Sequence, residues 1–182
     1  MPALLAIDFE TSCLPHEGRA FPIEVGLSDL NGHYRSWLIK PDASWKDWGW
    51  SDEARELHGL SFDQLWRLGQ PAAVVLAELS RAVRNYQVIA DSDLDAYWLT
   101  TLSATVSRAV PFAIEHVINL LEQIGSTPQE IQAAAAKLEE QHSFQHRAGP
   151  KARWLALLIR QLKDAARARL AAKCLRSYPG KR

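Results

Sequence analysis

The sequence predicts an α/β fold, a central mixed sheet of five strands flanked by helices. Three observations favour it. The chain opens with a short apolar stretch over 3–11 that is typical of a buried strand. Asn31 and Gly32, the strongest short hairpin signal, lie between two further strand patterns. A helical pattern then separates this hairpin from a fourth strand over 86–90, which is the crossover that parallel pairing requires.

The hairpin strands follow from alternation and from turn residues. Ile23, Val25 and Leu27 alternate onto one face of a strand predicted over 22–30. Its partner is expected over 33–40, beyond the Asn-Gly turn. Together with the first strand, these two predict an antiparallel meander.

Three helices are predicted before the fourth strand. Ser51 caps a short helix that ends near Leu57, and Ser61 with Gln64 forms a capping box for the second. Pro71 opens the third helix. The buried face expected for this third helix consists of Val74, Val75, Leu79 and Val83.

The second half of the chain combines helices with one more strand. A helix is predicted from 93 to about 107, and a fifth strand over 111–117. Thr127 begins the next helix, with Glu130 completing the cap, and a last helix runs from about 151 to 175. The residues expected to face inward are Leu94, Trp98 and Leu102 in the first of these helices and Trp154, Leu155, Leu158, Ile159 and Leu162 in the last.

Composition favours a single domain over residues 1–182. With 182 residues, 47% of them hydrophobic, and seven tryptophans, the chain can bury one sizeable core. No apolar run reaches the length of about 18 residues that a membrane span needs, and the start lacks the pattern of a secretory signal. Cys13 and Cys174 are far apart in sequence, which favours a reduced, cytoplasmic protein without structural zinc.

The net charge of zero conceals an asymmetry. Residues 1–146 carry 10 Lys and Arg against 20 Asp and Glu, whereas residues 147–182, with the basic C-terminal helix, carry 11 against one. Arg153, Arg160 and Arg167 recur every seven residues and form one stripe on that helix. Two interpretations stay open: a solvated helix, or a basic face for phosphates beside an acidic site that holds cations.

Asp8 and Glu10, at the end of the first strand, are the most informative pair. Because strand side chains alternate, both point to one face while Ile7 and Phe9 point to the other. Their Cα atoms lie roughly 6.6 Å apart, close enough to hold one metal ion or a pair. Two carboxylates on a core strand repel each other, and a divalent cation offsets this best. The alternative is a strand end with two solvated acids.

Three segments carry a resemblance to a known family. They are residues 7–11, Ile-Asp-Phe-Glu-Thr; residues 88–99, where Asp95 lies at a helix start; and residues 146–152, His-Arg-Ala-Gly-Pro-Lys-Ala. They resemble the three motifs of the DEDD superfamily of 3′–5′ exonucleases, which contains ribonuclease T and the proofreading subunit of DNA polymerase III. The third motif is similar to the His-x-Ala-x-x-Asp-Ala pattern of the histidine-containing (DEDDh) subgroup. The order of elements is similar to the ribonuclease H-like fold of this family.

The resemblance implies two-metal hydrolysis of phosphodiester bonds at the 3′ ends of single-stranded DNA or RNA. It implies that Asp8, Glu10 and Asp95 bind Mg²⁺ or Mn²⁺, hard cations that prefer oxygen ligands, and that His146 is the general base. The residues that it implies for substrate binding are Phe9, Thr11 and Leu60. A homodimer is in keeping with the family, many of whose members are dimers.

The sequence departs from the family at Lys151, which replaces the last metal-binding Asp. A cation at this position predicts attenuated cleavage with one metal ion or weakly bound metal, because even indirect damage to a metal site costs about 10–100-fold. The alternative is a catalytically inactive relative that keeps a nucleic-acid-binding or regulatory role. A second departure, Ala90-Asp91 in place of His-Asn, is expected to alter positioning only.

Two aromatic features also have alternative interpretations. Phe9 falls on the core face of its strand by alternation, which favours packing over contact with a base. Trp45, Trp48 and Trp50 lie in one loop, where they cover a small satellite core or stack on bases.

Overall fold

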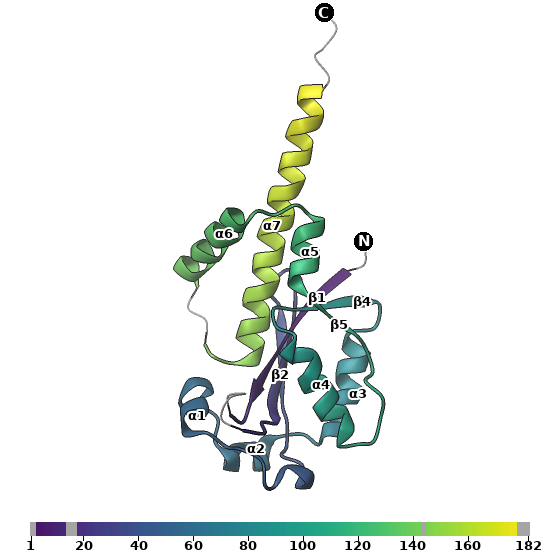
Figure 1. Cartoon of the computed structure of the whole chain (residues 1–182), viewed down its shortest axis with the longest axis vertical. Helices are drawn as coiled ribbons and strands as arrows, with labels where there is room; N and C mark the ends of the chain where they lie inside the picture. The colour runs from purple at the N-terminus through teal and green to yellow at the C-terminus, as the bar shows by residue number, and fades with distance from the viewer. Residues whose placement is uncertain (1–2, 14–17, 143–144, 178–182) are drawn as a thin grey trace, which may run out of the picture.

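The computed structural model describes residues 3–13, 18–142 and 145–177, and its centre is one five-stranded mixed sheet (Figure 1). The strands are β1 (Ala3–Thr11), β2 (Pro22–Asp29), β3 (Tyr34–Leu38), β4 (Tyr86–Ala90) and β5 (Ile114–His116). Their order in the sheet is β3-β2-β1-β4-β5. The β1–β2 and β2–β3 pairs are antiparallel, whereas β1–β4 and β4–β5 are parallel. The predicted α/β fold with a mixed five-stranded sheet is therefore confirmed.

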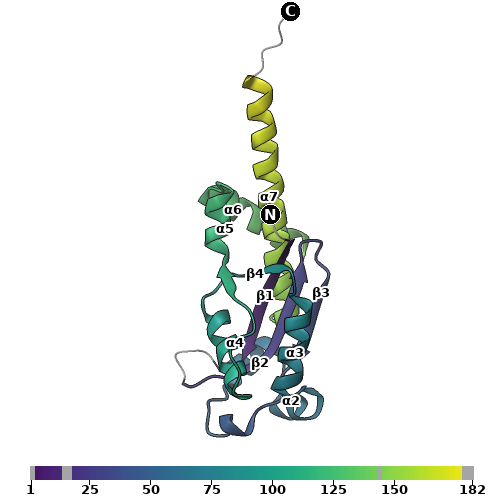
Figure 2. The same ribbon diagram turned by 90° about the vertical axis from the view of Figure 1, so that its right-hand side faces the viewer.

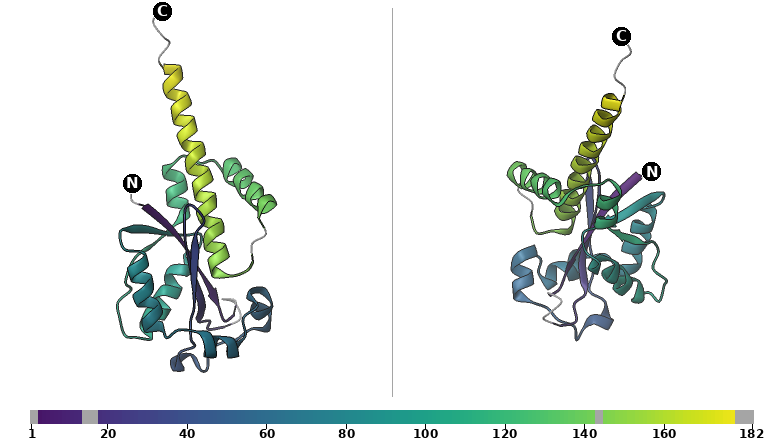
Figure 3. Two further views of the ribbon diagram at one scale, coloured as in Figure 1. Left: turned by 180° about the vertical axis from the view of Figure 1, so that it is seen from behind. Right: turned by 45° about the horizontal axis from the view of Figure 1, so that its top comes forward.

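Helices cover both faces of the sheet. They are α1 (Asp52–His58), α2 (Phe62–Leu68), α3 (Ala72–Ala82), α4 (Leu94–Ala104), α5 (Val117–Gln123), α6 (Pro128–Gln141) and α7 (Ala148–Ser177), with a 3-10 helix η1 at Ala43–Trp45. Apolar side chains of α3 and α4 pack on one face, and those of α5, α6 and α7 pack on the other. Helix α7 lies along β1 and β2 and extends beyond the body of the molecule (Figures 2 and 3). None of the helices in the described residues is both long and apolar enough to cross a bilayer.

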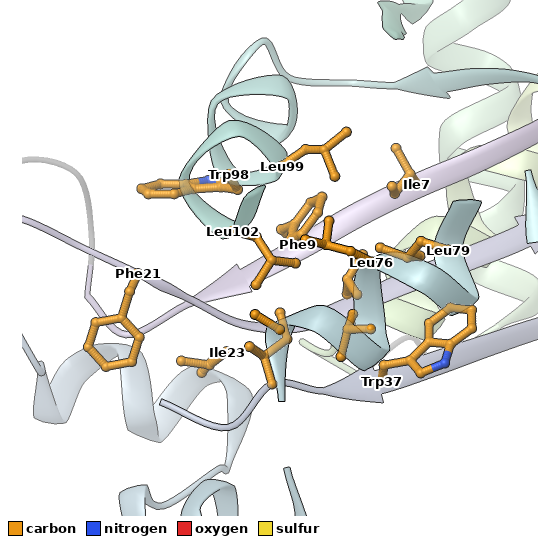
Figure 4. Packing of buried hydrophobic residues seen from close by; sticks show 14 of the residues in the cluster. Ile7, Phe9, Phe21, Ile23, Trp37, Leu76, Leu79, Trp98, Leu99 and Leu102 are labelled. Carbon is orange, nitrogen blue, oxygen red and sulfur yellow. The ribbon is translucent and has the colours of Figure 1, made fainter. Parts of the chain in front are cut away.

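The alternation of β1 determines where its acids lie. Ile7 and Phe9 enter the core under α3 and α4, as Figure 4 shows. Leu4 and Ala6 belong to the other core, under α7. By the same period of two, Asp8 and Glu10 point to the α7 face. The core role expected for the Phe9 side chain is confirmed.

Cap residues place the helix starts where the sequence predicts them. The Ser51 side chain accepts a hydrogen bond from the Ala54 amide at the start of α1. Capping boxes start α2, at Ser61 and Gln64, and α6, at Thr127 and Glu130. Capping side chains satisfy amides that have no partner within the helix, which is why these short motifs predict boundaries well.

Other expectations about the helices are wrong in detail. Val74 and Leu94, expected to be buried, are exposed, because α3 turns Leu76 inward instead and Leu94 lies at the very start of α4. Helix α5 is absent from the predicted order, since its short apolar sequence does not distinguish helix from strand. Helix α7 begins at Ala148 rather than at 151, because Pro150 is tolerated in a first turn.

The tryptophan loop covers a satellite of the core. Trp45 is buried and stacks on Phe21 with ring centroids 5.2 Å apart. Trp48 and Trp50 are partly buried and pack against the same core. This arrangement supports the packing interpretation of the three tryptophans.

Gly26 on β2 allows α7 to approach the sheet closely. A Cβ at position 26 would overlap the backbone of Ala148 and Gly149. We expect Gly26→Ala to lower the free energy of unfolding by about 1–3 kcal/mol, the usual effect of overpacking, as measured by urea denaturation. The control is Gly59→Asn, since Gly59 has a left-handed φ of 70° and open space around it. An equal loss in both variants would contradict the close-approach explanation.

Candidate functional site

The C-terminal end of β1 borders a cavity of about 350 Å³ on the α7 side. The starts of α4 and α7 supply the other walls. Its lining residues are Asp8, Phe9, Glu10, Thr11, Asp91, Ser92, Leu94, Asp95, Trp98 and Lys151. The fold therefore brings together acids that are far apart in sequence.

Asp8 is a half-buried carboxylate with an unpartnered oxygen. Its Oδ2 atom is buried and has no hydrogen-bond partner. Burial raises the pKa of Asp8 well above its usual range, Lys151 lowers it, and the nearby Asp95, Glu10 and Asp91 raise it further. A carboxylate in this environment has a free acceptor oxygen and is stabilised by any cation that enters the cavity.

Asp95 joins α4 to β1. Its Oδ1 atom accepts a hydrogen bond of 3.0 Å from the Phe9 amide, and its side chain is buried. Burial, followed by repulsion from Asp91, raises the pKa of Asp95 to about 7. Asp95 therefore positions the C-terminal end of β1 and adds a titratable carboxyl group to the cavity.

Lys151 reaches the acids from the first turns of α7. Its Nζ lies 3.0 Å from Glu10 Oε1 and forms an ion pair with it. Burial lowers the pKa of Lys151, but Asp8 and Glu10 raise it more, so the net shift is upward. The side chain is a cation at neutral pH and occupies one oxygen of Glu10.

The carboxylates that line the cavity have the chemistry that suits a hard divalent cation. Asp8 Oδ2 is buried without a hydrogen-bond partner, whereas Glu10 Oε1 has the Lys151 ammonium 3.0 Å away. Carboxylate oxygens are the ligands that Mg²⁺ and Mn²⁺ prefer. Within the described part of the chain, however, no three His, Cys, Asp or Glu side chains are grouped so as to hold a metal ion. The metal-binding roles of Asp8, Glu10 and Asp95 remain predictions.

The other expected site residues lie in different positions. Thr11 lines the cavity and donates from Oγ1 to the carbonyl of Cys13 at 3.0 Å. His146 is exposed just before α7 and is not among the lining residues. Leu60 is buried in the core and does not line the cavity either, and Phe9 contributes its backbone while its ring packs inside.

Three residues beside the site were not predicted as site residues from the sequence. Glu24 on β2 is buried and pairs with Arg147, which directly precedes α7. His58, at the end of α1, is buried close enough to both to feel their charges. The available signal was a lone glutamate within the buried strand pattern of β2, since such a charge requires a partner.

His58 makes stability depend on pH. Burial, together with the charges of Arg147 and Lys151 and against that of Glu24, lowers the pKa of His58 from 6.5 to about 4. Between pH 6.5 and about 4, His58 is therefore protonated in the unfolded chain but neutral in the folded protein. We expect the wild type to lose about 3 kcal/mol relative to His58→Gln as the pH falls from 6.5 to 4.

Urea denaturation of both proteins at several pH values measures this difference. The raised pKa values of Asp8 and Asp95 stabilise the folded state as the pH falls, which is the opposite effect. Because both proteins contain Asp8 and Asp95, this effect cancels in the comparison with His58→Gln. Parallel pH profiles for the two proteins would contradict the role of His58.

Comparisons with known proteins identify the fold. No family model and no curated protein sequence matches the chain. Among solved structures, a full-length 3′-exonuclease is 17% identical with a TM-score of 0.66, over 90% of this chain and 82% of that one. Pop2p of S. pombe, solved with Mg²⁺ and Mn²⁺ bound, is 15% identical with a TM-score of 0.60, over 90% and 83%.

A third similar structure is a larger protein. E. coli Exonuclease I in complex with a dT13 oligonucleotide is 12% identical with a TM-score of 0.59, over 99% of this chain but 44% of that one. At such low identities, these similarities show that the chain has the ribonuclease H-like fold of 3′-exonucleases.

Proposed function

We propose that the protein is a metal-dependent 3′–5′ exonuclease of the DEDDh subgroup that acts on single-stranded DNA or RNA ends with attenuated activity. The observation that supports it is one cavity lined by Asp8, Glu10 and Asp95, of which Asp8 has a buried oxygen without a hydrogen-bond partner. Similar solved structures include a 3′-exonuclease that recognises a histone mRNA stem-loop and E. coli Exonuclease I in complex with a dT13 oligonucleotide.

Each side chain of the proposed site has a separate role. Asp8 and Glu10 would hold Mg²⁺ or Mn²⁺, which when bound supplies an activated water and stabilises charge on the phosphate. Asp95 on α4 holds the end of β1 in place by accepting a hydrogen bond from the Phe9 amide. His146, exposed before α7, would accept the proton of the attacking water, a role suited to an imidazole at neutral pH.

Attenuation follows from Lys151. Its ammonium neutralises Glu10 and repels a divalent cation at the same oxygen. At an effective dielectric near 20, an ion pair at about 4 Å is worth about 4 kcal/mol in Coulomb energy. The Lys151 amine therefore competes with a weakly bound metal ion for the Glu10 carboxylate.

The Lys151–Glu10 pair also favours a second candidate function. If the amine takes the place of the metal permanently, the protein binds single-stranded nucleic acid without cleaving it. In that case Asp95 ties α4 to β1 and Lys151 ties α7 to β1 without a metal ion.

A nuclease assay distinguishes the two functions. Single-stranded DNA and RNA oligonucleotides labelled at the 5′ end are incubated with the wild type or Asp8→Ala, in Mg²⁺, Mn²⁺ or EDTA. The first function predicts shortening from the 3′ end that requires metal and Asp8. Binding without shortening supports the second function, and equal cleavage by both proteins would exclude the enzyme.

A further inference from the structure

Two glutamates lie side by side on neighbouring strands: Glu10 lines the cavity, and Glu24 is beside it. In the antiparallel register of β1 and β2, Glu10 lies directly opposite Glu24. Both side chains are buried, Glu24 to 1% exposure. Like charges directly opposite each other on a sheet repel, and a buried carboxylate needs a partner. Each glutamate therefore requires its own cation.

The start of α7 supplies both cations. Arg147 donates from Nε and Nη2 to the two oxygens of Glu24, each at 2.7 Å. Lys151 lies 3.0 Å from Glu10. The Lys151 amide donates to the Arg147 carbonyl at 3.0 Å, so the two cations are one helical turn apart. Two neighbouring anions of the sheet thus face two successive cations of the helix.

Glu24 also holds the backbone of the helix start. Its Oε2 accepts a hydrogen bond of 3.2 Å from the amide of Ala148, the first residue of α7. Amides in a first turn lack partners within the helix, and the helix dipole favours a negative charge there. One carboxylate therefore anchors both the side chain before α7 and its first amide.

We propose that the Glu24–Arg147 pair is a positioning device that sets where the start of α7 places His146 and Lys151 relative to Asp8 and Glu10. His146 directly precedes Arg147 in the chain, and Lys151 follows it by one turn, so movement of Arg147 moves both. This inference rests on the proposed function, because the residues that the pair positions are those of the exonuclease site. Glu24 and Arg147 act through these neighbours and do not line the cavity.

Packing offers a competing explanation that the experiment must separate. Ala148 and Ala152 are fully buried, and Gly26 lets the helix start sit directly on β2. If this packing alone fixes α7, loss of the ion pair lowers overall stability without any specific effect on the site. Positioning instead predicts a local change at the helix start and a selective loss of turnover.

The test uses the double variant Glu24→Gln/Arg147→Gln, which leaves no unpaired buried charge. The matched control is Arg169→Gln, because Arg169 tethers a distant part of α7 to Glu130 and to the Gly125 carbonyl. Both proteins are compared with the wild type by amide hydrogen exchange and by steady-state cleavage of single-stranded DNA in Mn²⁺. Mn²⁺ affinity is measured by calorimetry.

In the double variant, we expect faster exchange over 148–152 and a kcat lowered about 100-fold, with KM within about two-fold. Arg169→Gln should keep the wild-type kcat and change exchange only near its own contacts. The single variant Arg147→Lys keeps one charged contact with Glu24, so its kcat should lie between those of the wild type and the double variant. If the double variant does not fold, Arg147→Lys is compared with the wild type instead. Wild-type exchange over 148–152 together with wild-type kcat would overturn the proposal.

The experiment distinguishes failure of the proposed function from failure of the positioning role. A wild type that cleaves nothing would refute the exonuclease, whereas the exchange over 148–152 and the Mn²⁺ affinity would still decide whether the pair positions the helix start. Unchanged exchange and unchanged Mn²⁺ affinity in the double variant would refute positioning even then.

Discussion

Replacing Lys151 with aspartate is expected to raise Mn²⁺-dependent cleavage about 10- to 100-fold, the usual scale of effects at a metal site. The substitution removes the ammonium that lies 3.0 Å from Glu10 Oε1 and adds carboxylate oxygens on the same side of the cavity. Both changes favour a divalent cation. Initial rates on single-stranded DNA and RNA, with Mn²⁺ affinity from calorimetry, measure the gain.

Two comparisons make the Lys151 result specific. Lys151→Met removes the competing charge without adding a ligand, so it should raise Mn²⁺ affinity less than Lys151→Asp does. Lys163→Asp makes the same charge change further along α7 and should leave the rate unchanged. If Lys151→Asp binds Mn²⁺ no better than the wild type, the explanation of attenuation by a lost ligand is wrong.

Asp8→Asn is expected to abolish cleavage and to stabilise the metal-free protein. The activity loss should be at least about 100-fold, because the substitution removes a carboxylate that is proposed to bind the metal directly. Burial and the surrounding acids hold the pKa of Asp8 well above its usual range, so the ionised carboxylate weakens the fold near neutral pH. A neutral amide should raise the free energy of unfolding by about 1–2 kcal/mol.

The pH dependence of this gain follows from the direction of the pKa shift. As the pH falls toward 3.8, Asp8 takes up its proton in the folded protein before it does so in the unfolded chain. The stability difference between wild type and Asp8→Asn should therefore shrink in acid. Mn²⁺ at saturating concentration should raise the melting temperature of the wild type and not that of the variant, because the variant lacks the carboxylate proposed to bind the ion.

Asp47→Asn is the matched control for Asp8→Asn. Asp47 is an exposed acid on the surface, 4.0 Å from Lys46, so its replacement should change neither activity nor stability appreciably. A loss of stability in metal-free Asp8→Asn, comparable at all pH values, would contradict the view that Asp8 is destabilising without a cation.

The sequence alone predicts features that depend on neighbours in the chain. Strand alternation places Asp8 and Glu10 on one face, and it assigns the Phe9 ring to the core. The cap at Thr127 is likewise a local interaction, within four residues. Such features are predictable because the residues that cause them are close in sequence.

Features that depend on distant partners were not predictable in the same way. Glu24 and Arg147 are 123 positions apart, and no pattern near either residue indicates that they meet. Asp95 entered the site through a resemblance, since its bond to the Phe9 amide spans 86 positions. The exposure of Val74 depends on the rotation of α3 over the sheet, which the packing of Leu76 and Leu79 determines.

A crystal of the wild type soaked in Mn²⁺ and measured by anomalous scattering tests the central claim most directly. The claim is that the carboxylates of β1, which lie beside Asp95 of α4, form a site for a divalent cation. We expect an anomalous peak in contact with the Asp8 and Glu10 carboxylates, with the Lys151 amine moved away from Glu10. A cavity that stays free of Mn²⁺ at saturating concentration, with Lys151 still on Glu10, would contradict the claim.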